Sequence, residues 1–148
     1  MRYSLLITMI ILFFAGCKKD KYTTAPQISY KSVSPTVVDQ NSQSLTLTID
    51  ITDAEGDLGI TGSDTAFIYI KNLLNGAFDS LRFPDLQAGI AKNNFKADVE
   101  IDLSRARVFS CTPGPHTDTL FFEIYVTDFA KNKSNVIITG DAVYFKCP

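Results

Sequence analysis

The chain has 148 residues, of which 14 are basic and 16 acidic, and its formal net charge is -2 at pH 7. This length supports one domain with a substantial hydrophobic core and is short for two. Because the basic residues are not concentrated in one segment, nucleic acid is not an expected partner.

The N-terminus carries Arg2 and then a short apolar run, Leu5 to Phe14, which is followed by the small pair Ala15-Gly16 and by Cys17. As a helix, this run would cover only about 15 Å, roughly half of a bilayer core, so a permanent membrane span is not expected. A basic start, a short apolar segment and small residues before a cleavage site are typical of a secretory signal.

The small pair followed by Cys17 resembles the lipobox of bacterial lipoproteins, although Phe14 stands where that family usually has Leu. The resemblance implies that the chain is cleaved before Cys17 and lipidated on its thiol, and that it is held in the outer membrane, facing the periplasm or the cell surface. It divides the chain into a signal peptide (1–16), a lipidated N-terminus with a flexible tether (17–25) and a folded domain (26–148). The alternative is an ordinary secretory signal with a chance cysteine nearby.

Two cysteines, Cys111 and Cys147, remain once the lipid-bearing cysteine is set aside. In an oxidising compartment they are expected to form a disulfide. Two unpaired thiols are the alternative.

From Pro26 onward, apolar residues recur with a period of two, which is typical of half-buried strands. No stretch has the pattern of an amphipathic helix, and Asn75-Gly76 predicts a tight hairpin turn. Strands are expected over residues 27–38 with a bend at Pro35, 45–52, 65–70, 78–83, 95–103, 118–127 and 136–146, the last with a bulge at Gly140-Asp141.

About seven strands at this spacing predict an all-β fold, an antiparallel β-sandwich with Greek-key connections. The arrangement resembles the immunoglobulin-like and cadherin-like sandwiches, although the Trp and the inter-sheet disulfide of antibody domains are missing. In such a sandwich the alternating strand directions bring Cys111 and Cys147 to one pole. The ends of the second and sixth strands then meet at the opposite pole.

Acidic residues gather where those two strands end. The sequence DAEGDLG starts at Asp53 and supplies Glu55 and Asp57, with Asp64 nearby, and Asp128 ends the sixth strand. Converging carboxylates repel one another unless a hard cation neutralises them, so these five residues predict a calcium site. Turn chemistry, in which Asp and Gly bind local backbone amides, is the alternative. An EF-hand is excluded because its required glycine is missing and no helices flank the loop.

The same acidic turn resembles one in small uncharacterised bacterial lipoproteins, whose later strand ends in Asp followed by a small residue and Asn-x-Ser. Asp128, Ala130, Asn132 and Ser134 match that pattern, with Lys131 where glycine is common. The resemblance concerns the fold and says little about activity.

Three aromatic residues, Tyr69, Phe121 and Tyr125, are expected on one sheet face, where they would form a binding surface. The alternative is a second sheet face that a loop covers. The single histidine, His116, lies in a predicted loop, so a hydrolase triad or a histidine-based zinc site lacks its parts.

These patterns do not predict an enzyme. They predict a membrane-anchored, extracytoplasmic and non-catalytic module that binds a protein or a glycan. The alternative is a structural spacer or a subunit of a surface assembly, stiffened by calcium.

Overall fold

The structure is a computed structural model and describes residues 21–42, 44–61, 64–85 and 93–148. The predicted signal peptide, Cys17 and the first tether residues lie outside this part of the chain. No helix among the described residues is long and apolar enough to cross a membrane. The elements are β1 (Gln27–Ser34), β2 (Val37–Asp39), β3 (Thr46–Asp53), β4 (Ile60–Thr61), β5 (Asp64–Thr65), β6 (Phe67–Asn72), β7 (Phe78–Arg82), β8 (Phe95–Asp102), the 3-10 turn η1 (Leu103–Arg105), β9 (His116–Leu120), β10 (Phe122–Thr127), β11 (Ile137–Ile138) and β12 (Val143–Cys147).

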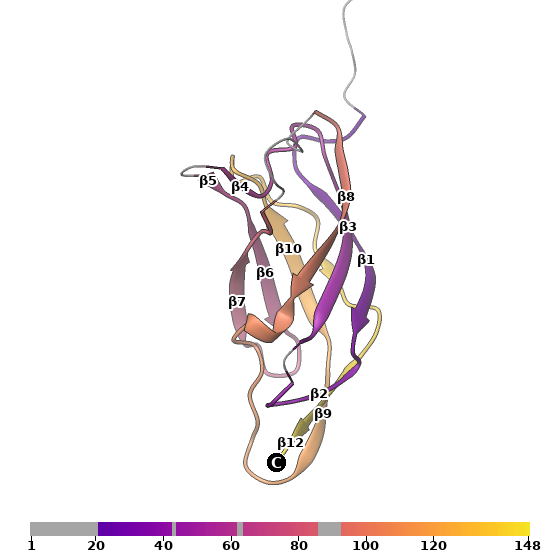
Figure 1. Cartoon of the computed structure of the whole chain (residues 1–148), viewed down its shortest axis with the longest axis vertical. Coiled ribbons are helices and arrows are strands. Elements are labelled where there is room, and N and C mark those ends of the chain that lie inside the picture. The colour runs from indigo at the N-terminus through magenta and orange to yellow at the C-terminus, as the bar shows by residue number, and fades with distance from the viewer. Residues whose placement is uncertain (1–20, 43, 62–63, 86–92) are drawn as a thin grey trace, which may run out of the picture.

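Two sheets pack face to face in a sandwich that is elongated along its strands (Figure 1). One sheet has the order β1-β3-β8 and the other β11-β10-β6-β7. Neighbouring strands in both sheets are antiparallel. The chain changes sheet between β3 and β6, between β7 and β8 and between β8 and β10. The predicted all-β antiparallel sandwich is confirmed.

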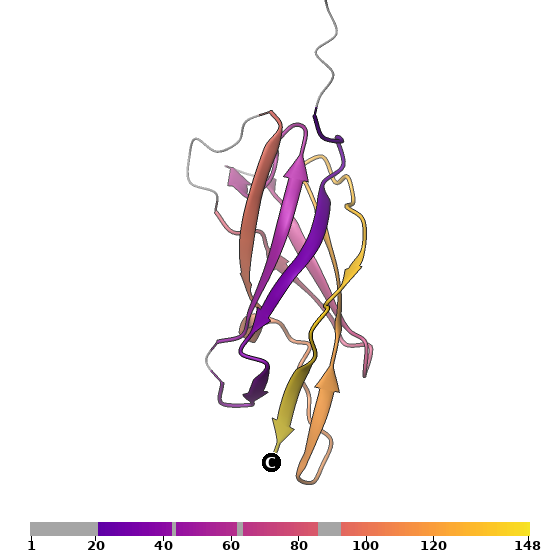
Figure 2. The same ribbon diagram turned by 90° about the vertical axis from the view of Figure 1, so that its right-hand side faces the viewer.

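A smaller sheet with the order β2-β12-β9 extends one end of the sandwich (Figures 1 and 2). Only Phe121 separates β9 from β10, so one long strand moves from the small sheet into the large one. The last strand does the same between β11 and β12. The bulge expected at Gly140-Asp141 is therefore a change of sheet. The period-two pattern continues through Phe121, which explains why the sequence predicts one unbroken strand there, whereas the interruption predicted at Gly140-Asp141 coincides with the second change of sheet.

The transition at Gly140 depends on Tyr30 of β1. A Cβ at Gly140 would lie 3.0 Å from the ring atom Cε1 of Tyr30, and the Tyr30 hydroxyl donates to Asp141 Oδ2 at 2.6 Å. Burial and the charge of Asp141 raise the pKa of Tyr30 to about 12. The first strand region bends as predicted, because a cis peptide bond at Ser34-Pro35 separates β1 from β2.

Alternation along the strands fills the space between the sheets. In β3, Leu47, Ile49 and Ile51 are fully buried, while Thr48 and Asp50 between them are half-buried. Their burial is the main source of folding free energy, at roughly 25 cal/mol for each Å² of apolar surface removed from water. The largest fully buried side chains are Phe83, Phe122, Leu47, Ile49, Ile51, Ile68, Ile70, Leu103, Leu120, Ile124, Val108 and Val126.

The β6–β7 hairpin forms where the sequence predicts it. Gly76 has a φ of 74°, a backbone conformation that residues with a Cβ rarely adopt. The side-chain oxygen of Asn75 accepts from the amide of Ala77 at 2.9 Å, and the Gly76 amide donates to the carbonyl of Asn72 at 2.9 Å. Each half of the Asn-Gly pair therefore has a separate part in the turn.

The two ends of the sandwich differ in chemistry. At one end, the acidic pole, the loop after β3 (residues 53–59) meets the loop after β10 (128–134). The described chain also starts there (Figure 1), because the amide of Ala54 donates to the carbonyl of Thr23 at 3.0 Å. At the other end, the C-terminal pole, lie β2, β9 and β12. Here Cys111 is bonded to Cys147 with an Sγ–Sγ distance of 2.01 Å, as the sequence predicts.

Replacing both Cys111 and Cys147 by Ala should lower the free energy of unfolding by ~3–4 kcal/mol, because the disulfide closes a loop spanning 36 residues. Urea denaturation monitored by tyrosine fluorescence measures this loss. The wild type in reducing agent should show the same loss, and the double variant should not respond to reductant. An unchanged midpoint in the double variant would contradict the prediction.

Candidate functional site

The acidic pole is built by two inward-facing rows of side chains that end in carboxylates. In β3 the buried row at residues 47, 49 and 51 continues to Asp53, which is 0% exposed. In β10 the buried row at residues 122, 124 and 126 continues to Asp128, which is also 0% exposed. Strand alternation therefore places both carboxylates at the end of the hydrophobic core.

The loop after β3 folds around Asp53. Its Oδ2 accepts from the amides of Gly56 at 2.5 Å and of Asp57 at 3.3 Å. Gly56 has a φ of 66°, which lets the chain turn back over the carboxylate. Leu58 is 2% exposed and packs into the core, so it fixes the far side of the loop.

The loop after β10 explains the Asp-x-Ala-x-Asn-x-Ser pattern. The two oxygens of Asp128 accept from the backbone amide of Asn132 at 2.7 Å and from its side-chain amide at 2.9 Å. Ser134 Oγ accepts from the amide of Val126 at 2.9 Å. Lys131 has a φ of 69°, a backbone conformation that is uncommon for residues with a Cβ.

Three carboxylates converge at this pole. Ligand oxygens of Asp53, Glu55 and Asp57 all lie within 4.8 Å of one another. The amide of Phe129 donates to the carbonyl of Asp57 at 3.0 Å and so joins the two loops. Asp128, fixed by Asn132, lies next to this group, as its effect on Asp57 shows. Asp64 is exposed on β5 and is not part of the compact cluster.

The buried oxygens of this cluster are not all satisfied. Among the described residues, Asp53 Oδ1 and Asp57 Oδ1 are buried and have no hydrogen-bond partner. None of the ion pairs in this part of the chain involves Asp53, Glu55, Asp57 or Asp128. The site therefore brings carboxylates together without a cationic side chain, with Asp53 on its buried side and Glu55 on its exposed side.

Burial and, to a smaller extent, the charge of Asp57 raise the pKa of the Asp53 carboxyl to about 7, and the hydrogen bonds from the amides of Gly56 and Asp57 limit this shift. Burial also raises the pKa of Asp57, followed by the charge of Asp128. At neutral pH the two groups are therefore close to sharing a proton.

A second group of metal-ligand types lies at the C-terminal pole and comprises His116, Asp118 and Cys147. His116 Nε2 is 3.5 Å from Asp118 Oδ2, and its Nδ1 lies 2.6 Å from the carbonyl oxygen of Gly114. Because the sulfur of Cys147 is bonded to Cys111, no thiolate is present to bind a metal.

The predicted aromatic face is a stack that crosses the large sheet. Tyr69 of β6 lies between Phe78 of β7 and Tyr125 of β10, with ring centroids 5.9 Å and 4.6 Å away. The ammonium group of Lys133 lies 3.9 Å from the centroid of Tyr125 on the next edge. The faces of both tyrosine rings are thus already covered. Phe121 is 37% exposed at the change of sheet and takes part in none of these ring contacts.

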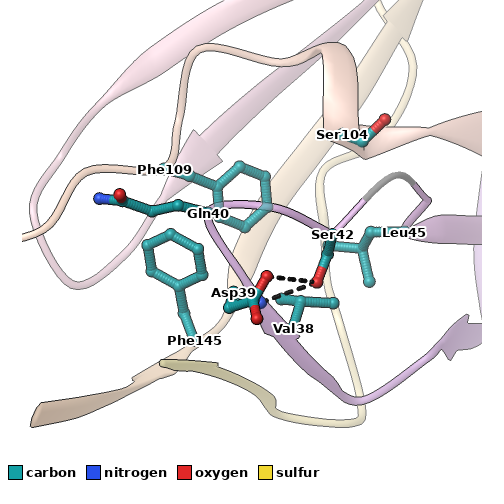
Figure 3. A pocket seen from close by; sticks show the side chains of 8 residues that line it. All are labelled: Val38, Asp39, Gln40, Ser42, Leu45, Ser104, Phe109 and Phe145. Atoms are coloured by element: carbon teal, nitrogen blue, oxygen red, sulfur yellow. Dashed lines mark hydrogen bonds between the residues drawn. The ribbon is translucent and has the colours of Figure 1, made fainter. Parts of the chain in front are cut away.

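A pocket of about 260 Å³ opens near the C-terminal pole, between the β2–β3 loop and the segment after β8 (Figure 3). Apolar side chains form its floor, because Val38, Leu45 and Phe145 are almost fully buried. Its rim is polar, and Asp39 Oδ1 accepts from Ser42 Oγ at 3.1 Å. The remaining lining residues are Gln40, Ser104 and Phe109.

Sequence reasoning did not find this pocket. Its lining comes from residues 38–45, 104–109 and 145, which are far apart in the chain and carry no shared motif. The two phenyl rings, Phe109 and Phe145, lie 5.3 Å apart between centroids and look like ordinary core residues in the sequence.

No protein-family model and no curated protein sequence matches the chain. Among solved structures, the β-glucosidase from Kluyveromyces marxianus in complex with glucose is similar over 84% of this chain, at 11% identity and a TM-score of 0.34. The match covers 15% of the enzyme, so this chain spans a small part of its length.

The raised pKa of Asp53 gives a specific dependence of stability on pH. The folded state holds this proton up to about pH 7, whereas the unfolded chain loses it near 3.8. Without divalent cations, the free energy of unfolding should therefore fall as the pH rises from about 4 to about 7, by on the order of 3 kcal/mol. Chemical denaturation in EDTA at several pH values measures this fall in the free energy of unfolding.

The variant Asp53→Asn should lose most of that dependence, because its neutral amide keeps an acceptor for Gly56 and adds a donor for Asp57. Glu100→Gln, which removes an exposed carboxylate of β8, is the matched control and should behave as the wild type. An equal fall in stability in Asp53→Asn and in the wild type would contradict the assignment.

Proposed function

We propose that the chain is a lipid-anchored, extracytoplasmic module without catalytic activity that binds a protein or glycan partner at its C-terminal pole. The observation that carries this proposal is the position of the pocket, at the end of the molecule opposite to the start of the described chain (Figure 1). A sandwich attached at one pole presents the other pole to its surroundings.

The geometry of the tether supports this orientation. The amide of Lys21 donates to Asn94 Oδ1 at 2.6 Å, and the carbonyl of Thr23 accepts from the amide of Ala54. The chain therefore leaves the sandwich at the acidic pole. Lys21 follows Cys17 by four residues, which span at most about 14 Å. A lipid on Cys17 would therefore hold the acidic pole close to the membrane and the pocket far from it.

The strand arrangement supports an immunoglobulin-like type of sandwich. The first strand region divides, so that β1 pairs antiparallel with β3 while β2 pairs parallel with β12. One continuous segment, β1 followed by β2, therefore pairs first with the three-stranded sheet and then with β12 of the small sheet. Domains of this kind bind partners through loops at one pole, held by a rigid framework.

The chemistry of the pocket favours one sugar residue of a glycan. Phe109 supplies a partly exposed apolar ring above a floor that includes the buried Phe145, while Asp39 and Gln40 supply hydrogen-bonding groups on the rim. A sugar has an apolar ring face and peripheral hydroxyls, which match such a lining. The volume of about 260 Å³ is small and suits a single ring. The aromatic stack is less suitable, because its tyrosine faces are already covered.

The anchor is tested by expressing the full chain in an outer-membrane-bearing bacterium that is fed labelled palmitate. The wild type should carry the label and fractionate with the membrane, and Cys17→Ser should lose both properties. The variant Cys111→Ser/Cys147→Ser is the matched control and should keep the label. Label on Cys17→Ser, or no label on the wild type, would contradict the proposed lipid anchor on Cys17.

Binding is tested by screening the domain, as the chain from Lys18 onward, against an oligosaccharide array and following the best ligand by NMR titration. Shifts should cluster around the pocket, and Gln40→Ala should weaken binding at least fivefold. Lys133→Ala, which alters the aromatic stack, should leave affinity unchanged. Loss of binding in Lys133→Ala alone would assign the ligand to the aromatic face, and no bound sugar at all would contradict the glycan assignment.

A further inference from the structure

When both Asp53 and Asp57 are ionised, the unsatisfied oxygens at the acidic pole need a positive partner. Asp53 is fully buried, yet its Oδ1 has no hydrogen bond, and the buried Oδ1 of Asp57 has none either. A buried carboxylate oxygen without a donor is costly, and native proteins rarely leave one in that state. The fixed loop prevents Asp53 from turning away, because Oδ2 is held by the Gly56 amide at 2.5 Å.

From these buried oxygens and the converging carboxylates, we propose that Asp53, Glu55 and Asp57 bind one calcium ion. Their ligand oxygens lie within 4.8 Å of one another, a spread that an ion with bonds of about 2.3–2.6 Å can bridge. Asp128 contributes its negative charge from the neighbouring loop, although Asn132 occupies its two oxygens. The ion would replace the absent hydrogen-bond donors on both buried oxygens.

Calcium fits this site better than magnesium. It accepts six to eight oxygens in irregular arrangements, whereas magnesium requires a near-ideal octahedron and keeps several waters. The inner side of the site is formed by the buried Asp53, a setting that disfavours an ion which keeps most of its hydration shell. The outer side is formed by the exposed Glu55, where an ion can enter and keep the waters that complete its shell.

The expected affinity is low. Three carboxylates and no preformed cage resemble the sites of extracellular modules, which bind calcium with dissociation constants of about 0.1–1 mM. Such a site fills only where calcium is millimolar. It would stiffen the loop after β3, which meets the loop after β10 through the hydrogen bond from the Phe129 amide to the Asp57 carbonyl.

Thermal unfolding with calcium, with magnesium and with EDTA tests the proposal, using the chain from Lys18 onward at pH 7.5. Calcium at 10 mM should raise the Tm of the wild type by roughly 4–8 °C over EDTA. The variant Asp57→Asn should lose this shift, and Glu100→Gln, with the same change of charge, should keep it. In EDTA, Asp57→Asn should be at least as stable as the wild type, because it buries one charge fewer.

Three outcomes would overturn the proposal: no shift in the wild type at 10 mM calcium, an equal shift in Asp57→Asn, or an equal shift with magnesium at the same concentration. If Asp57→Asn fails to fold, NMR titration of the wild type with calcium decides the matter. Saturable shifts confined to residues 53–59 and 128–132 support the site, and shifts spread over surface carboxylates contradict it.

Discussion

Strand alternation carries two carboxylates into the end of the hydrophobic core, and the acidic pole follows from that constraint. The inward row of β3 ends in Asp53 and that of β10 ends in Asp128, and both side chains are fully buried. Neither can leave without turning a whole strand over, because a shift of one residue would expose every core side chain of that strand. The loops therefore fold around the carboxylates: the amide of Gly56 donates to Asp53, and the amide of Asn132 donates to Asp128. A pole built in this way is ordered by polar contacts.

The opposite pole is organised by different forces. Here the strands leave the main sheets and form the small sheet of β2, β9 and β12, which the disulfide closes. The pocket lies near this small sheet, between the β2–β3 loop and Phe109. The aromatic stack on the large sheet belongs to neither pole. Its rings cover one another, so it acts as a cross-strand brace between β7, β6 and β10.

Much of this architecture could be predicted from the sequence, because period-two alternation and turn residues act locally. The strands and the Asn75-Gly76 hairpin came from such signals, while the cysteine pair was predicted from the cysteine count and the oxidising compartment that the N-terminus implies. The change of sheet at Phe121 was not predicted, because alternation continues through it. At Gly140 the sequence predicted an interruption of the strand, but the change of sheet and the contact with Tyr30 were not predicted. The convergence of the acidic loops was predicted from strand direction. The position of Asp64 outside the carboxylate cluster was not, because it depends on the pairing of β5 with β4. The pocket could not be predicted, because three distant segments form it without any shared pattern.

The attachment of the chain at one pole also determines how the molecule would bear mechanical load. Tension between a membrane anchor and a partner at the C-terminal pole would run parallel to the strands (Figure 2). β1 receives that tension first, and its ladder with β3 extends from Gln27 to Ser34. The hydrogen bonds of the ladder are perpendicular to the strands, so they would be loaded together in shear and not opened one after another. At the far end, the bond between Cys111 and Cys147 would stop β12 from being drawn out. The sandwich is thus arranged as a link that resists extension along its long axis.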